Sequence, residues 1–545
     1  MIKLINIVLF CSLLTFSLSA QDCDMTIAAN EFIIDGETTS IPAGSTVCIE
    51  SSQKDYLLIK NVHGTENQPI TFINSNGQVL FDTDNFYGIK IANCSFIKFL
   101  GNGYEGIDYG FKIKRVANGS GMSIDELSTN IEVSNIEISN TLIAGLYAKT
   151  DPDCTFASSR DNFTMYSLHI HDCYFHDIGD EGMYIGHSKY EQGVYLDACD
   201  TTIFPHLIKD VKIYNNILEH CGWDGIQVSS SDEDCSIYNN IIRYDSDKET
   251  LYQMSGILIG GGSRCDCYNN EIYDGKGDGI DVLGLGGFMV YNNLIVRAGR
   301  SFEPGNPNSA KHGIYVGDVV TLANLDFKFY NNTIVSPKSY GITYNNPVAN
   351  QGVIINNIIA DPGKIDEGES AYVNNLTSSA NLTLSNNIFS PSISDIGFTN
   401  PSSDDYSLKN GSIAIDFGKN LSSEGVTFDL LNHNRPYNTF YDVGAYEYQG
   451  PDAIGEAGKE SAFVGQVFPN PAKNYTSINI RPLKSGVCTF TIRSIDGKQL
   501  FELDSYCQGG INNKIEIDLK GLSPQLCILT VNTGTYSVNH KLIIQ

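Results

Sequence analysis

The chain has 545 residues, and its 63 acidic residues against 35 basic ones give a formal net charge of -28. Such an acidic surface argues against nucleic acid as a partner, because the phosphate backbone would be repelled. The abundant carboxylates suit solubility in salt and make calcium a possible ligand, although we expect no required cofactor.

The first twenty residues are typical of a cleaved secretory signal. Lys3 precedes an apolar run over residues 4–14, and small residues stand before Gln21. No later apolar run reaches about 18 residues, so no membrane-spanning helix is expected. We therefore predict an exported chain that meets an oxidising environment, where disulfides form.

The middle of the chain repeats the phrase Tyr-Asn-Asn, usually followed by aliphatic residues. From one second asparagine to the next the steps are 24, 30, 23, 39, 25 and 30 residues, which is a solenoid period with insertions. Each period holds short apolar alternations, which favour strands over helices. The copies begin at Tyr214, Tyr238, Tyr268, Tyr291 and Tyr330, and degenerate ones at Ile355 and Ser385.

This pattern predicts an all-β fold, a right-handed parallel β-helix solenoid over residues 21–450. Its coils should stack at about 4.7–4.9 Å, so that equivalent residues lie above one another. The second asparagine of each copy should then form a ladder of side-chain amides. Residues 21 to about 85 lack the repeat, and we expect them to form the N-terminal cap and first coils.

Cysteine positions predict three disulfides. Cys235 and Cys265 each stand three residues before a repeat tyrosine, which makes them stacked neighbours one coil apart. Cys23 with Cys48 would close the N-terminal coils. Cys154 with Cys199 would join two inserted loops.

A second phrase, one residue followed by Gly and alternating aliphatics, marks one strand of each coil. The aliphatics one and three after Gly should face inward, while Gly resets the alternation by positive φ or a bulge. Because buried carboxylates are costly, we interpret the residue before Gly as facing outward. An alternative is that its aspartates only cap turns. This column comprises Ala144, Glu181, Asp224, Ser255, Asp278, His312 and Tyr340.

The segments Asp278-Gly279-Ile280-Asp281 and His312-Gly313-Ile314 resemble motifs of polygalacturonase-type glycosidases, which share the β-helix. The chain departs from that family because no Asp-Asp pair lies between the motifs, Lys311 replaces a Gly, and no Arg-x-Lys follows. Secreted β-helix lyases for alginate or chondroitin are the nearest competitor. Their basic groups would be supplied here by Lys189, Lys276, Arg297, Arg300 and Lys311.

Four insertions break the period, at residues 149–166, 187–206, 245–253 and 299–311. We expect the last three to rim the column between Glu181 and His312, since long loops on a rigid scaffold carry function. Aromatic rings near the column would stack on sugars. The predicted substrate-binding residues are Tyr184, Trp223, Gln227, Tyr315, Arg300 and Lys311.

The end of the chain shows two further resemblances. Residues 405–416 and 442–448 are similar to the closing segment of many secreted bacterial β-helix proteins, which places the end of that domain near 450. After a linker over 451–465, residues 466–545 open with Val467-Phe468-Pro469-Asn470-Pro471 and resemble the type IX secretion sorting domain of Bacteroidetes, a small antiparallel β-sandwich. That resemblance implies the type IX machinery as partner and a secreted or cell-surface location.

These features predict a secreted, monomeric, carbohydrate-active enzyme that cleaves glycosidic bonds of a polysaccharide by carboxylate acid/base hydrolysis. Asp278 would be the general acid, Asp224 or Asp281 the base, and His312 would orient Asp278, with Glu181 as a further candidate. Asp224 and Asp278 would lie two coils apart, roughly 9–10 Å, near the spacing of inverting glycosidases. The alternatives are a calcium- or Lys/Arg-assisted lyase acting on a uronate glycan, and a non-catalytic glycan-binding protein or adhesin.

Overall fold

The computed structural model describes residues 23–302, 310–349, 351–363, 372–377, 380–450, 463–468, 472–482, 485–494, 498–508, 513–533 and 537–544. The predicted signal segment lies outside these residues. The chain divides into two compact units, residues 1–450 and 451–545.

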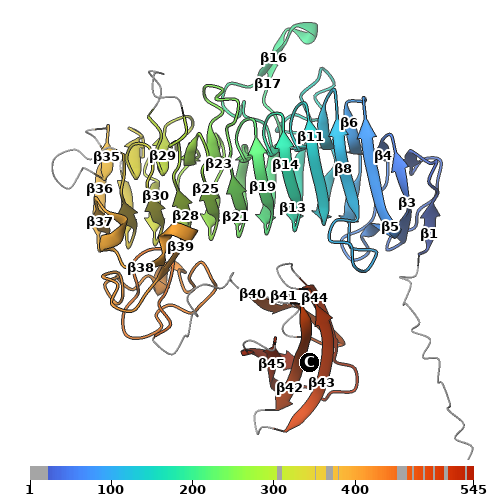
Figure 1. The fold of residues 1–545 in the computed structure, drawn as a ribbon. Coiled ribbons are helices and arrows are strands. Elements are labelled where there is room, and N and C mark those ends of the chain that lie inside the picture. The colour runs from blue at the N-terminus through green and yellow to red at the C-terminus, as the bar shows by residue number, and fades with distance from the viewer. Residues whose placement is uncertain are drawn as a thin grey trace, which may run out of the picture. The chain divides into compact units, whose positions relative to one another are not determined.

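The first unit is a parallel β-helix with three strands in most coils (Figure 1). One face is a 12-stranded sheet, and the other two faces belong to a single 23-stranded sheet. Every pairing between successive coils that we describe is parallel, for example Tyr184 of β15 with Gln227 of β20. The predicted β-helix is confirmed, and its coils begin as early as β1 (Met25–Ile27).

The 12-stranded sheet consists of β2 (Ile33–Asp35), β4 (Leu57–Lys60), β6 (Tyr87–Ala92), β9 (Ser120–Asp125), β12 (Leu146–Ala148), β15 (Met183–Ile185), β20 (Ile226–Val228), β23 (Ser255–Ile259), β26 (Asp278–Val282), β29 (Ile314–Gly317), β32 (Ile342–Asn345) and β35 (Val373–Asn375). The 23-stranded sheet consists of β1, β3 (Thr46–Lys54), β5 (Ile70–Thr83), β7 (Ser95–Leu100), β8 (Phe111–Val116), β10 (Thr129–Ser134), β11 (Ile136–Thr141), β13 (Thr164–His171), β14 (Tyr174–Ile178), β18 (Leu207–Tyr214), β19 (Ile217–Cys221), β21 (Ser231–Tyr238), β22 (Ile241–Arg243), β24 (Cys265–Tyr268), β25 (Glu271–Tyr273), β27 (Phe288–Tyr291), β28 (Leu294–Val296), β30 (Asp326–Tyr330), β31 (Thr333–Val335), β33 (Gln351–Ile355), β34 (Ile358–Ala360), β36 (Asn381–Ser385) and β37 (Ile388–Ser390).

The asparagine ladder lies at the corner between the two faces of the larger sheet. The first Asn of each pair has a left-handed backbone, as at Asn239 with φ 56°, a conformation that Asn tolerates better than most residues. The second Asn is buried: the Asn240 Nδ2 and backbone N–H both donate to Asn270 Oδ1, at 3.0 and 3.1 Å. The same bonds run from Asn216 to Asn387. The predicted ladder is confirmed.

All three predicted disulfides are present: Cys23–Cys48, Cys154–Cys199 and Cys235–Cys265. The second joins the insertions at 149–166 and 187–206. The latter insertion carries the hairpin β16 (Val194–Leu196) and β17 (Thr201–Ile203), which projects from the coils in Figure 1.

Residues 391–450 fold back along the coils after β37, the last strand of the helix. They include the hairpin β38 (Phe398–Asn400) and β39 (Asp405–Leu408) and share an apolar cluster with Leu294, Val335 and Ile358. A buried ion pair, Arg435 with Glu447 at 2.9 Å, lies within this segment. The segment therefore covers an outer face of the larger sheet.

The second unit is antiparallel. A three-stranded sheet contains β40 (Phe463–Phe468), β41 (Tyr475–Arg481) and β44 (Asn513–Asp518). A four-stranded sheet contains β43 (Gln499–Cys507), β42 (Gly486–Ser494), β45 (Gln525–Asn532) and β46 (Ser537–Ile544). Residues from both sheets, such as Ile478 and Phe490, share one core. This is the predicted β-sandwich.

Replacing Asn240 by Ala should lower the free energy of unfolding by about 2–4 kcal/mol. The substitution leaves the amide donors of Asn216 without their acceptor in a buried corner, and such groups cost about 1–3 kcal/mol each. Denaturant unfolding followed by circular dichroism measures this. The matched control is Asn239→Gly in the same turn, which keeps the left-handed backbone and should be nearly neutral. Equal destabilisation by both variants would contradict a structural ladder.

Candidate active site

The residues before each Gly form one stacked column on the 12-stranded face. With one exception the glycine after each column residue from Ala144 to His312 donates its N–H to the carbonyl of the next column residue, at 2.9–3.2 Å. At that exception, Ser255 and Asp278 are register partners in β23 and β26. The structure thus brings Glu181, Asp224, Asp278 and His312 together in the predicted order.

The glycine beside each column residue faces the core. A Cβ added at Gly279 would lie 2.5 Å from Ile295 Cγ2, a core atom, and Ile280 beyond it is also fully buried. Two successive residues therefore face inward, so the predicted change of alternation occurs. None of these glycines has a positive φ, and the register of β23 with β26 is continuous, so neither of the two predicted causes is present at this pair. The Asp278 side chain is consequently directed away from the core.

The column is nevertheless buried, and our expectation that it avoids burial is wrong. Glu181, Asp224 and Asp278 are only 3%, 0% and 6% exposed, and Gln227 in the neighbouring column is 3% exposed. The reason is that inserted segments lie against this face: Ser246 N–H, for example, donates to the carbonyl of Trp223 at 2.8 Å.

Asp278 is held by a cation and a backbone donor. Lys311 Nζ lies 3.0 Å from its Oδ2, and the His312 N–H donates to its Oδ1 at 2.5 Å. Burial alone would lower the pKa of Lys311, but the charges of Asp278 and Asp281 raise it. The His312 ring lies 3.0 Å from Thr343 Oγ1, so His312 orients Asp278 through its backbone.

Three other carboxyl groups of the cluster hold their protons more tightly than usual. Burial raises the pKa of Asp224 well above its ordinary range, despite a 2.8 Å bond from Ser255. Burial and the charge of Asp278 raise the pKa of Asp281 in the same way. Burial raises the pKa of Glu181 to about 7. Asp224 Oδ2 and Asp281 Oδ1 are shielded and have no hydrogen-bond partner among the described residues.

Asp245 is a member of this cluster that the sequence analysis missed as a site residue. It is 1% exposed, burial raises its pKa to about 7, and its charge acts on both Asp224 and Asp281. A Cβ at Gly275 would lie 1.9 Å from its Oδ2, so the neighbouring turn requires glycine. Asp245 opens an insertion where the period breaks, so no repeated pattern marks it.

Some of the predicted substrate-binding residues lie beside the column, and Arg300 does not. Tyr184, Trp223 and Tyr315 are half-buried beside the column. Tyr184 stacks on Tyr147 with ring centroids 5.5 Å apart. Arg300 donates instead to the carbonyls of Ser336 and Asp361 in turns of later coils. It also lies 3.5 Å from the Asp361 carboxylate, and it has no described contact with the carboxylates of the column.

A second polar cluster lies at the N-terminal end of the column. Lys149 and His187 both contact Asp151 Oδ1, His187 at 3.4 Å, and Lys149 Nζ lies 4.9 and 5.3 Å above the rings of Tyr147 and Tyr184. The combined contacts of His187 and Lys149 hold the pKa of Asp151 well below its usual range, against the effect of burial. These contacts fix the insertion that begins at Lys149.

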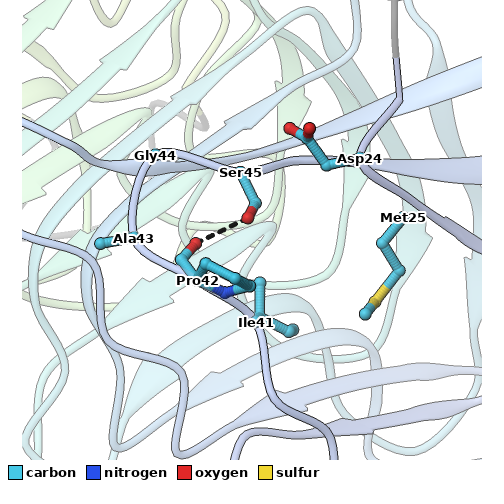
Figure 2. Close-up of a pocket in the computed structure, with 7 residues that line it drawn as sticks. All are labelled: Asp24, Met25, Ile41, Pro42, Ala43, Gly44 and Ser45. Carbon is cyan, nitrogen blue, oxygen red and sulfur yellow. Dashed lines mark hydrogen bonds between the residues drawn. The ribbon is translucent and has the colours of Figure 1, made fainter.

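A hollow of about 330 Å³ at the N-terminal end of the helix is a poor candidate (Figure 2). Its only ionisable group, Asp24, already accepts the N–H of Thr46 at 2.8 Å. Ser45 donates to the carbonyl of Pro42 across its floor. The hollow brings together no groups for catalysis.

Within the described ranges, no three His, Cys, Asp or Glu side chains are arranged to hold a metal ion. Calcium binding therefore stays a prediction. In the same ranges no helix is long and apolar enough to cross a membrane.

Two families match this chain. The family described as right handed beta helix region matches residues 192–389, and the secretion system C-terminal sorting domain matches residues 466–545. The chain therefore combines a right-handed parallel β-helix with a type IX sorting domain. This domain indicates secretion by the type IX system, with attachment at the cell surface or release.

Solved structures are only distantly similar to this chain. A GH136 lacto-N-biosidase from Eubacterium ramulus is 12% identical, with a TM-score of 0.39 over 67% of this chain and 68% of its own. Pectate lyase Pel9A is 13% identical, with a TM-score of 0.38 over 78% and 97%. At this similarity neither carries a conclusion about activity. No curated protein sequence matches the chain.

The stability of the fold should depend on pH through Glu181. Between its ordinary pKa of 4.5 and its folded value of about 7, the folded state keeps a proton that the unfolded chain has lost. The free energy of unfolding therefore falls as pH rises through this window, by up to about 3 kcal/mol. Glu181→Gln should match the wild type at pH 4 and be more stable at pH 8, as measured by denaturant unfolding. An equal effect at both values would contradict a buried, proton-bearing Glu181.

Removing residues 455–545 should leave the first unit folded and functional but block its export from the native host. The second unit has its own sheets and core, and the core cluster of the β-helix contains none of its residues. Circular dichroism of the purified fragment and fractionation of the host culture test this. Export of the truncated chain would count against the sorting role.

Proposed function

We propose that this protein is a secreted glycoside hydrolase that cleaves a polysaccharide at the carboxylate column. The observation that carries the proposal is that Asp278 lies beside a cation, Lys311, in a cluster of carboxyl groups. The pKa values of two of those groups, Asp224 and Asp281, are raised. General acid/base hydrolysis uses one carboxyl group that accepts a proton and a second one that donates a proton. Export by the type IX system supports a polymer outside the cell as substrate.

The contacts favour roles opposite to those assigned from sequence. Asp278 faces an ammonium and an N–H donor, which suits the base that takes a proton from the attacking water. Asp281 is half-buried and its pKa is raised, which suits the acid that donates a proton to the leaving glycosidic oxygen. Asp224 is fully covered, so we assign it to tuning Asp281.

Tyr184, Trp223 and Tyr315 would then contact sugar rings on either side of the reacting bond, since aromatic faces suit the apolar faces of sugars. Lys311 serves mainly to hold the Asp278 carboxyl group in position. His312 and Ser255 position Asp278 and Asp224.

A lyase is the second candidate, and Lys311 is the observation that favours it. Its ammonium lies among the carboxylates, where it could neutralise a substrate uronate. Incubation with a panel of neutral and acidic polysaccharides separates the candidates. New reducing ends without ultraviolet absorbance indicate hydrolysis, and reducing ends with the absorbance of an unsaturated uronate indicate elimination. If neither signal appears, the glycan-binding alternative remains.

Asp278→Asn should lower kcat by about 10²–10⁴-fold while the fold persists, because the amide keeps the shape of the side chain but cannot accept a proton. The matched control is Asp326→Asn, an aspartate of β30 on the larger sheet, which should keep full activity. Reducing-end assays measure both, after thermal unfolding shows that both variants are folded. Full activity of Asp278→Asn would contradict a catalytic role and would favour the alternative that Asp278 only caps a turn.

A further inference from the structure

We propose that the strap, residues 245–253, is a carbohydrate-binding subsite in which the Tyr252 ring stacks on a sugar of the substrate chain. This rests on the proposed function for its location, since the strap adjoins the carboxylate cluster. It adds a binding residue that no repeat or motif of the sequence indicates.

The tip of the strap exposes apolar surface. Tyr252 is 85% exposed and Leu251 is 48% exposed, although large apolar side chains usually find cover. The backbone of Tyr252 is also left-handed, with φ 67°. For a bulky residue that conformation is unfavourable and is kept where its surroundings require it. The strap thus presents an aromatic face to solvent at a local energetic cost.

Contacts on both sides fix the strap. Lys248 pairs with Asp180 at 2.9 Å toward earlier coils, and Glu249 pairs with Lys276 at 2.9 Å toward later ones. The Lys248 N–H also donates to the carbonyl of Gly222 at 2.9 Å. The tip is therefore held as a platform across the coils, so that stacking a sugar requires little further ordering.

Asp245, the first residue of the strap, belongs to the carboxylate cluster. Asp245 Oδ2 and Gln253 Oε1 are shielded and, in the part of the chain that is described, accept no hydrogen bond. Directly after the strap, the carbonyl of Met254 accepts the N–H of Asp278 at 3.0 Å and faces Lys311 Nζ at 3.4 Å. Tyr252 is thus two residues from a contact of the proposed base. The exposed ring would meet the C–H face of a sugar whose chain continues toward the carboxylate cluster.

The test measures binding apart from catalysis. In the Asp278→Asn background, native electrophoresis is run in gels containing polygalacturonate, alginate, xylan or laminarin, and retardation reports binding. Adding Tyr252→Ala should weaken retardation about tenfold, which corresponds to the loss of roughly 1.4 kcal/mol. Tyr252→Trp should keep it. Phe86→Ala, which removes another very exposed ring (76%) in the turn between β5 and β6 of an earlier coil, should have no effect.

Unchanged retardation with Tyr252→Ala would overturn the subsite, as would a parent protein that none of these gels retards. Because Tyr252 is exposed, its substitution leaves the core untouched, and circular dichroism verifies this. If Asp278→Asn keeps its activity while Tyr252→Ala loses binding, the subsite stands and the proposed hydrolysis fails. The two proposals can therefore fail separately.

Discussion

The exact repeat of backbone position from coil to coil is the constraint on which the rest of this structure depends. Parallel pairing places each residue about 4.7–4.9 Å above its counterpart, so any residue type that recurs at one position forms a ladder. An asparagine suits such a ladder because its amide both donates and accepts: Asn240 gives to Asn270 and receives from Asn216. The buried side-chain amide of each second asparagine is thereby satisfied by its neighbours in the ladder.

The same stacking has the opposite effect on carboxylates, which only accept. Glu181 and Asp224 are column neighbours, with Asp278 two coils further on, and they cannot satisfy one another as amides do. Burial under the insertions then favours the protonated form at Asp224 and Glu181, while Lys311 lies against Asp278. A structural rule of the solenoid thus gathers carboxyl groups of raised pKa beside one that a lysine contacts, a combination that suits the proposed acid/base chemistry.

Features that follow the period could be predicted from the sequence, and features of the insertions could not. The period located the ladder, the pair Cys235–Cys265 and the order of the column, because each depends only on position within a coil. The burial of Asp224 depends on the path of an insertion, and the repeat does not determine that path. Asp245 was missed for that reason, and the Arg300 side chain reaches turns of later coils that periodicity does not connect to it.

The most direct test of acid/base hydrolysis at this column is the fate of water oxygen. The purified protein is incubated with a polysaccharide that it degrades in water enriched in ¹⁸O, and the products are analysed at once by mass spectrometry. Hydrolysis predicts one ¹⁸O at each new reducing end, because activated water supplies that oxygen. Products without ¹⁸O that carry an unsaturated sugar would show elimination instead, and would contradict the account of Asp278 and Asp281 given above.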